Sequence, residues 1–122
     1  MIRVRLRNLT LDGEGLPKLA GASPEISIEG HADYGKKGED IVCAGVSALA
    51  GTVIVAITRI AGIRQDVDQR EGVLRTVLYP GESSDERRRS LEVILGTLLL
   101  GLREMQTQYP ENIDIIFEYR GL

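Results

Sequence analysis

Residues 25–47 read EISIEGHADYGKKGEDIVCAGVS and join two different patterns through one polar loop. Isoleucine alternates with polar residues over residues 25–29, which is typical of a half-buried strand. From 40 to about 59, apolar residues fall on nearly every face of a helix, which predicts a well-buried helix. His31 and Cys43, the only histidine and the only cysteine of the chain, stand near the two ends of this loop. The same stretch therefore sets a strand, a helix and the two residues on which thiol chemistry would depend.

Residues 2–7 alternate apolar and basic residues with period two, which is typical of a half-buried strand, and residues 65–69 and 73–79 are two further predicted strands. The last two flank Arg-Glu-Gly, a short turn signal, and are therefore predicted to form a hairpin. The first is predicted to pair with residues 25–29 as a hairpin with a long loop. The sequence assigns no element to the Gly- and Pro-containing connection between them.

A second helix is predicted to begin in SSDERRRS, after a Pro-Gly break. Ser84 is the expected N-cap, and Asp85 and Glu86 place negative charge in the first turn, where the helix dipole favours it. Apolar residues at three- and four-residue steps form one core-facing stripe: Leu91, Ile94, Leu95, Leu98, Leu102 and Met105. Pro110 is expected to stop the helix, and a last strand is predicted over residues 113–119.

The predicted order of elements is β-β-α-β-β-α-β. This order implies an α/β (α+β) fold in which a single mixed or antiparallel sheet is packed by two helices. The 122 residues contain no repeat, linker or low-complexity tract, so one domain over 1–122 is expected. With one Phe, four Tyr and no Trp, the core must consist mainly of Ile, Leu, Val and Ala.

Composition indicates the cellular compartment of the protein and excludes some classes of binding partner. A single cysteine cannot form an internal disulfide, which fits a reducing compartment, and the start MIRVRLRN lacks the apolar core of a signal peptide. The apolar run 41–57 contains Ser47 and Thr52 and is short for a membrane span. A formal charge of −3 argues against direct binding of nucleic acid over the whole body of the protein. We therefore expect a cytoplasmic, soluble protein that does not bind membranes or nucleic acid directly.

Cys43 falls in the first turn of the predicted helix, as roughly its third residue. Asp40 is a good N-cap because its carboxylate can accept hydrogen bonds from the backbone N–H groups two or three residues later. The unpaired N–H groups and the dipole of a helix start stabilise a thiolate, as does a nearby imidazolium. Strand end, loop and helix start share one edge of the sheet, so His31 is able to lie beside Cys43. A thiolate next to a histidine is the minimum apparatus of a cysteine nucleophile.

Each of these residues also has a purely structural explanation. A free cysteine in a helix is more often a small buried hydrophobe than a nucleophile, and a histidine at a strand end is more often a hydrogen-bonded loop residue. Asp40 is fully explained as a cap, although it is also able to orient His31. Ser47 either hydrogen-bonds the carbonyl of Cys43 or is a weaker nucleophile deeper in the helix. One histidine and one cysteine are too few soft ligands for a structural zinc site, so no metal is expected.

The stretch GHADYGKKGEDIVCAGVSAL resembles the signature of the ribosomal-processing cysteine protease family Prp, with Gly-His-Ala at its start and Asp-Ile-Val-Cys-Ala at its centre. The segment LLLGLREMQTQYPENI is similar to the second helix and the Tyr-Pro segment of that family, so the resemblance covers essentially the whole chain. It implies a catalytic dyad of His31 and Cys43, supported by Asp40 and Ser47. The glycine-bearing loop that would close over the peptide substrate contains Gly30, Tyr34, Gly35 and Gly38.

The resemblance also implies a reaction. Members remove a short N-terminal extension from the precursor of large-subunit ribosomal protein twenty-seven, after a hydrophobic, aromatic-rich sequence. They are homodimers, for which the apolar first helix would supply contact, and no cofactor is expected. His31 would raise the thiolate population and protonate the leaving amine, while Cys43 would attack the scissile carbonyl. Backbone N–H groups at the helix start are the expected oxyanion donors.

Two other functions stay open at this point. A non-catalytic protein of the ribosome or its assembly would need no reactive thiol, and its cysteine would be replaceable. A thiol hydrolase or transferase acting on small molecules would share the dyad, but it would have a compact pocket in place of an open peptide groove.

Overall fold

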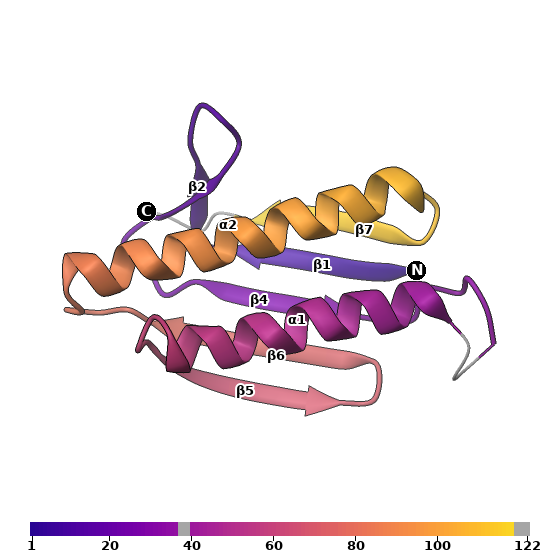
Figure 1. Cartoon of the computed structure of the whole chain (residues 1–122), viewed down its shortest axis with the longest axis horizontal. Helices are drawn as coiled ribbons and strands as arrows, with labels where there is room; N and C mark the ends of the chain where they lie inside the picture. Colours follow the sequence, from indigo (N-terminus) through magenta and orange to yellow (C-terminus); the bar gives the residue numbers. More distant parts are fainter. Residues whose placement is uncertain (37–39, 119–122) are drawn as a thin grey trace.

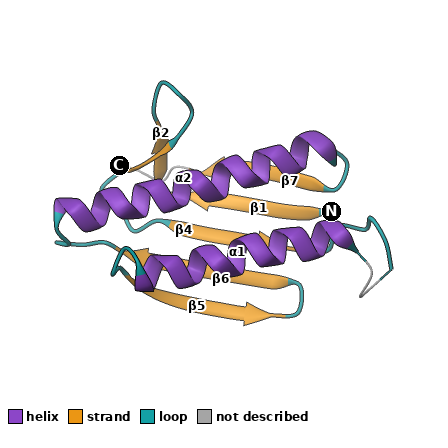
Figure 2. Cartoon of the chain, in the orientation of Figure 1, coloured by secondary structure: helices purple, strands orange, loops and turns teal. Residues whose placement is uncertain are grey.

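One mixed sheet carries both long helices on the same face (Figures 1 and 2). The computed structural model describes residues 1–36 and 40–118. Within these residues the elements are β1 (Ile2–Arg7), β2 (Leu9–Leu11), β3 (Pro17–Leu19), β4 (Glu25–Glu29), α1 (Ile41–Arg59), β5 (Arg64–Arg70), β6 (Val73–Tyr79), α2 (Asp85–Gln108) and β7 (Ile113–Glu118).

The described part of the main sheet has five strands in the order β5-β6-β4-β1-β7. β1 pairs antiparallel with β4 and parallel with β7, whereas β4–β6 and β5–β6 are antiparallel pairs. The predicted pairing of the first strand with residues 25–29 and the predicted second hairpin are both confirmed. The mixed sheet packed by two helices confirms the expected fold class. Residue 119, predicted to end the last strand, lies outside the described residues.

The connection between β1 and β4 contains a hairpin that the sequence did not indicate. β2 and β3 pair antiparallel, with Leu9 opposite Leu19 and Leu11 opposite Pro17. Their turn is organised by Asp12, whose Oδ1 accepts hydrogen bonds from the backbone N–H groups of Glu14 and Leu16. Strands of three residues are too short to display a period of two, and a proline usually counts against a strand. The prediction of a plain connection was therefore wrong.

Helix α1 begins where the sequence predicts, but it is less buried than predicted. A stripe at three- and four-residue spacing is buried: Val42, Val46, Ala50, Val53 and Ile57. On the other side Ile41 is 57% exposed and Val55 is 54% exposed. By length and composition alone α1 is apolar enough to cross a membrane, a test that core helices of soluble proteins also pass. An apolar residue facing solvent and one facing the core look alike in the sequence, so the pattern overstated burial.

Helix α2 agrees with its sequence-based description. The side chain of Ser84 caps it by accepting from the backbone N–H of Arg87, and the helix ends at Gln108, before Pro110. The predicted stripe faces the core, with Ile94 and Met105 partly buried against it. Its fully buried members include Leu91, Leu95, Leu98 and Leu102.

The two helices approach closely at two glycines. A Cβ added to Gly45 of α1 would lie 2.8 Å from Cε of Met105, and one added to Gly101 of α2 would lie 2.7 Å from Cδ2 of Leu49. Real Cβ atoms do not come so near a neighbour, so the missing side chains let each helix receive a long side chain from the other. This contact fixes α1 along the sheet, and with α1 it fixes Cys43.

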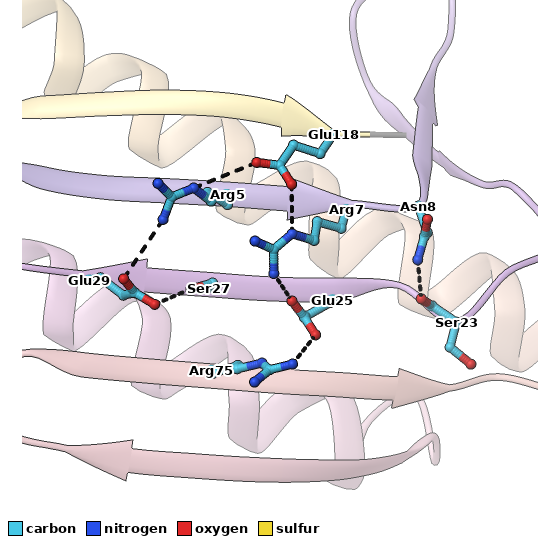
Figure 3. Close-up of polar contacts among 9 residues, drawn as sticks. All are labelled: Arg5, Arg7, Asn8, Ser23, Glu25, Ser27, Glu29, Arg75 and Glu118. Carbon is cyan, nitrogen blue, oxygen red and sulfur yellow. Dashed lines mark hydrogen bonds and ion pairs between the residues drawn. The ribbon is translucent and has the colours of Figure 1, made fainter. Parts of the chain in front are cut away.

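The sheet face opposite the helices carries a ladder of ion pairs (Figure 3). Its members are Arg5, Arg7, Arg75, Glu25, Glu29 and Glu118. In the strand register Arg7 lies opposite Glu25 on β4 and opposite Glu118 on β7. Arg5 and Arg75 both lie opposite Ser27 and reach their carboxylate partners diagonally across the strands. Opposite charges across a strand pair stabilise that pairing, and the ladder therefore favours the observed register.

Glu25 shows how the ladder depends on pH. Burial raises the pKa of its carboxyl, but hydrogen bonds from Arg75 and Arg7 outweigh burial, so the pKa lies below the ordinary value of 4.5. A carboxyl whose pKa is lower in the folded than in the unfolded chain stabilises the fold at every pH above its pKa in the unfolded chain. That contribution is lost as the pH falls through the folded value. The ladder thus holds the sheet at neutral pH and weakens in acid.

Candidate active site

His31 and Cys43 lie at one end of the sheet, where β4 ends and α1 begins (Figure 1). Gly30, directly after β4, has a φ of +96°, and a Cβ there would lie 2.5 Å from the carbonyl oxygen of Met1. Only glycine fits both the backbone angle and the close approach, so Gly30 lets the chain leave the sheet at this point. The exposed His31 follows at once, on the edge of the sheet that the sequence predicted.

Cys43 is the third residue of α1 and is half-buried. The backbone N–H of Ala32 donates a hydrogen bond to its Sγ over 3.2 Å. Within the described residues no hydrogen bond joins the imidazole of His31 to this thiol. Such catalytic contacts often tighten only when substrate binds, so the geometry is compatible with a dyad.

Asp40 caps α1 and also ties down the loop before it. Its Oδ1 accepts from the backbone N–H groups of Val42 and Cys43, each at 3.0 Å. Its Oδ2 accepts from those of Tyr34 at 3.0 Å and Gly35 at 3.2 Å. The hydrogen bond from Cys43 is the largest cause that holds the pKa of the Asp40 carboxyl below its ordinary value; burial opposes it, and the other three bonds add to it. The predicted cap is confirmed, and the tether to the loop is a second role.

The first N–H groups of α1 are therefore already occupied. Those of Val42 and Cys43 donate to the Asp40 side chain, and that of Ala44 donates to the Asp40 carbonyl oxygen at 3.1 Å. The cap uses these three groups in the structure, and the expectation that they serve as oxyanion donors stays a prediction. The structure places the N–H of Ala32 beside the reacting sulfur.

Two substitutions separate the two roles of Asp40. Asp40→Ala removes both and should lower the melting temperature by about 5 °C or more. Asp40→Asn keeps an oxygen for Val42 and Cys43 but turns an NH₂ donor toward the N–H groups of Tyr34 and Gly35. We therefore expect its melting temperature to lie between those of wild type and Asp40→Ala. Thermal melts of the three proteins measure this, and an Asn variant as unstable as the Ala variant would mean that the tether matters more than the cap.

The loop is also held by two residues from the far end of the chain. The ring of Tyr34 packs edge-to-face on that of Tyr109, with centroids 5.1 Å apart. Nδ2 of Asn112 donates to the carbonyl oxygen of Ala32 at 2.8 Å, which fixes the peptide unit next to the one that faces the sulfur. Sequence reasoning gave neither residue a role, although both lie in the Tyr-Pro segment that carried the family resemblance.

Two cavities meet at His31 and Cys43. The smaller one, about 210 Å³, lies between α1 and the β5–β6 hairpin. Its apolar walls are Ile2, Ile28, Val46, Ala50, Val73 and Leu74. The larger one, about 430 Å³, lies on the loop side and is lined by carboxylates, namely Asp33, Asp40 and Glu71. A peptide lying across Cys43 would thus meet aliphatic walls together with Gln69 and Arg70 on one side, and three carboxylates on the other.

The remaining predicted site residues have mixed outcomes. Ser47 lines both cavities, and among the described residues its hydroxyl makes no hydrogen bond, so the expected bond to the carbonyl of Cys43 is not formed. Gly38 lies outside the described residues. In the described part of the chain no group of three or more His, Cys, Asp or Glu side chains is placed to hold a metal ion.

Residues 17–114 match the family described as cysteine protease Prp. The chain belongs to that family. The ribosomal processing cysteine protease Prp of Staphylococcus aureus (strain Mu50) is 32% identical over 100 residues, which cover 80% of this chain and 90% of that one.

Two crystal structures of the S. aureus Prp protease are similar over 96% of this chain and 99% of theirs, at 28% identity. The one with a covalently linked product peptide has a TM-score of 0.73, and the one with a substrate peptide has a TM-score of 0.68. Membership of the Prp family makes this chain a cysteine protease and confirms the resemblance read from residues 30–49.

Proposed function

We propose that this protein is an endopeptidase that uses Cys43 as nucleophile and His31 as general base to remove an N-terminal extension from a ribosomal protein precursor. One observation carries the assignment of the nucleophile. A cysteine protease needs a cysteine, and Cys43 is the only one in the chain. His31, likewise the only histidine, lines both cavities that Cys43 lines.

The reaction follows from these positions. His31 takes the thiol proton, and the thiolate of Cys43, already facing the N–H of Ala32, attacks the scissile carbonyl carbon. The carbonyl oxygen gains the negative charge, for which the Ala32 N–H is a preorganised donor. As the C–N bond breaks, the proton on His31 passes to the leaving amine, and water then hydrolyses the thioester with His31 again as base.

The aliphatic walls of the smaller cavity support cleavage after a hydrophobic sequence. This cavity opens beside the nucleophile, and its lining residues from β4, α1 and β6 are rigidly placed by the sheet and the helix. An apolar side chain of the substrate that entered it would leave water, which favours binding by about 25 cal/mol per Å² of buried apolar surface. Two adjoining cavities at one nucleophile give room for residues on both sides of a scissile bond, which supports a peptide over a small molecule as the substrate.

The proposed substrate is the precursor of large-subunit ribosomal protein twenty-seven, as the family resemblance implies. Relatives named for ribosomal processing, and the structure of one of them with a substrate peptide, support this proposal. The substrate and the lone cysteine both favour the cytoplasm as the place of reaction, which cell fractionation would test.

A synthetic peptide that spans the extension and the start of the mature protein tests the proposed function directly. After incubation with the protein, mass spectrometry should find one new C-terminus after a hydrophobic residue and one new N-terminus. An intact peptide, bound but uncut, would favour the alternative of a non-catalytic ribosome-associated protein.

We also propose that two copies of the chain associate through α1. From residue 41 to residue 58 this helix carries no charged side chain, and its outward side exposes Ile41, Ala44, Ala48, Thr52 and Val55. Burying such a side against a second copy would remove apolar surface from water. Light scattering should give twice the mass of one chain at micromolar concentration, and a mass of one chain would contradict the dimer.

A further inference from the structure

We infer that Gly72, in the turn between β5 and β6, is a positioning residue for His31. The inference rests on the proposed role of His31 as base. Gly72 also lines the smaller cavity, so an effect through the imidazole has to be told apart from an effect on substrate binding.

The strand register brings the two residues together. β4 pairs with β6 so that Glu29 lies opposite Val73, and the next backbone pair is Gly30 and Gly72. The N–H of Gly30 donates to the carbonyl oxygen of Gly72 over 2.9 Å, which extends the ladder one step past the strands. His31 is the next residue of the chain, so the hairpin tip is the part of the sheet against which it must rest.

The imidazole lies directly on the glycine. A Cβ built on Gly72 would be 3.1 Å from Nε2, 3.5 Å from Cε1 and 3.9 Å from Cδ2 of His31. Three ring atoms at this range mean that the ring packs against the Cα where a side chain would stand. Within residues 1–36 and 40–118 no side chain hydrogen-bonds the imidazole. The contact with the turn therefore does part of what a third, orienting residue does in a catalytic triad.

Two separate features disfavour a side chain at this position. Gly72 has a φ of +74°, a backbone conformation that other residues adopt with strain. In addition, a Cβ at 3.1 Å from Nε2 forces the ring to shift by a few tenths of an ångström. Small displacements of a catalytic group reduce turnover strongly, because reacting atoms must lie within a narrow range of distance and angle.

Gly72→Ala and Gly21→Ala separate these two features. Gly21 has a similar φ of +87°, yet no atom lies within 4 Å of the Cβ that Ala would add. Both variants carry the backbone strain, but only Gly72→Ala displaces His31. We expect kcat for the synthetic precursor peptide to fall about tenfold in Gly72→Ala with little change in KM, and to stay at the wild-type value in Gly21→Ala. If Gly72→Ala fails to fold, Gly72→Asn places a Cβ at the same point with a residue that tolerates positive φ.

A double-mutant cycle with His31→Ala decides whether Gly72 acts through the imidazole. In the His31→Ala background the ring is gone, so Gly72→Ala should cause no further loss of kcat. Gly72→Ala should also lower the melting temperature more than Gly21→Ala does, because only Gly72→Ala displaces the ring, and this difference should disappear in the His31→Ala background. Equal losses with and without His31, or a Gly72→Ala variant as active as wild type, would overturn the inference. Full activity of His31→Ala itself would instead refute the proposed base.

Discussion

Cys43→Ser should abolish cleavage of the precursor peptide, with kcat/KM reduced more than about 1,000-fold. Serine has nearly the same shape, and its hydroxyl can still accept from the N–H of Ala32, which now faces the sulfur at 3.2 Å. A hydroxyl is far harder to ionise than a thiol, however, and one histidine with no hydrogen bond to the nucleophile at rest is a weak activator. The loss should therefore be chemical and not structural.

Four measurements make this result specific. Melting temperature and peptide binding should stay close to wild type, because the substitution leaves no large cavity. Iodoacetamide should label the wild-type protein only once, because Cys43 is the sole cysteine, and should not label the variant. Ser47→Ala, one turn further along the same face, should reduce cleavage far less than Cys43→Ser. Wild-type release of the extension by folded Cys43→Ser would exclude Cys43 as the nucleophile.

The parts of the site that are local in sequence could be predicted from it. Asp40 reads as a cap because a carboxylate before an apolar periodic run has one obvious use, and the helix begins one residue later. Once α1 was placed, Cys43 had to lie in its first turn. Gly30 and the alternation before it likewise marked where β4 ends. Each of these inferences needed only neighbours a few residues apart.

The parts that depend on strand register could not be predicted. Gly72 follows Gly30 by 42 positions and meets it only because β4 pairs with β6 in one register of several that the alternation allows. Asn112 reaches Ala32 because β7 joins β1 in parallel, after a helix of 24 residues. A pattern of apolar residues indicates which face of a strand is buried, but it does not indicate which other strand lies beside it in the sheet.

The oxyanion donors show a different limit. The general rule that a helix start offers free N–H groups is correct for an uncapped helix. Here one carboxylate takes two of them, and the same carboxylate draws the loop toward the helix. The cap and the oxyanion site were both predicted from the backbone N–H groups at the start of α1. An N–H group that donates to the cap cannot fully serve an oxyanion as well.

His31→Ala should lower kcat/KM about 100-fold at neutral pH, and the deficit should shrink as the pH rises. Without the imidazole the thiolate forms only by loss of a proton to water, which becomes favourable near pH 8.5 for an ordinary cysteine. Alkylation of Cys43 by iodoacetamide needs the thiolate alone, whereas cleavage also needs a proton for the leaving amine. Alkylation rates of variant and wild type should therefore converge at alkaline pH, while cleavage stays slower in the variant. Equal cleavage by both proteins at pH 7 would exclude His31 as the base, and a cleavage deficit that vanished together with the alkylation deficit would exclude it as the acid.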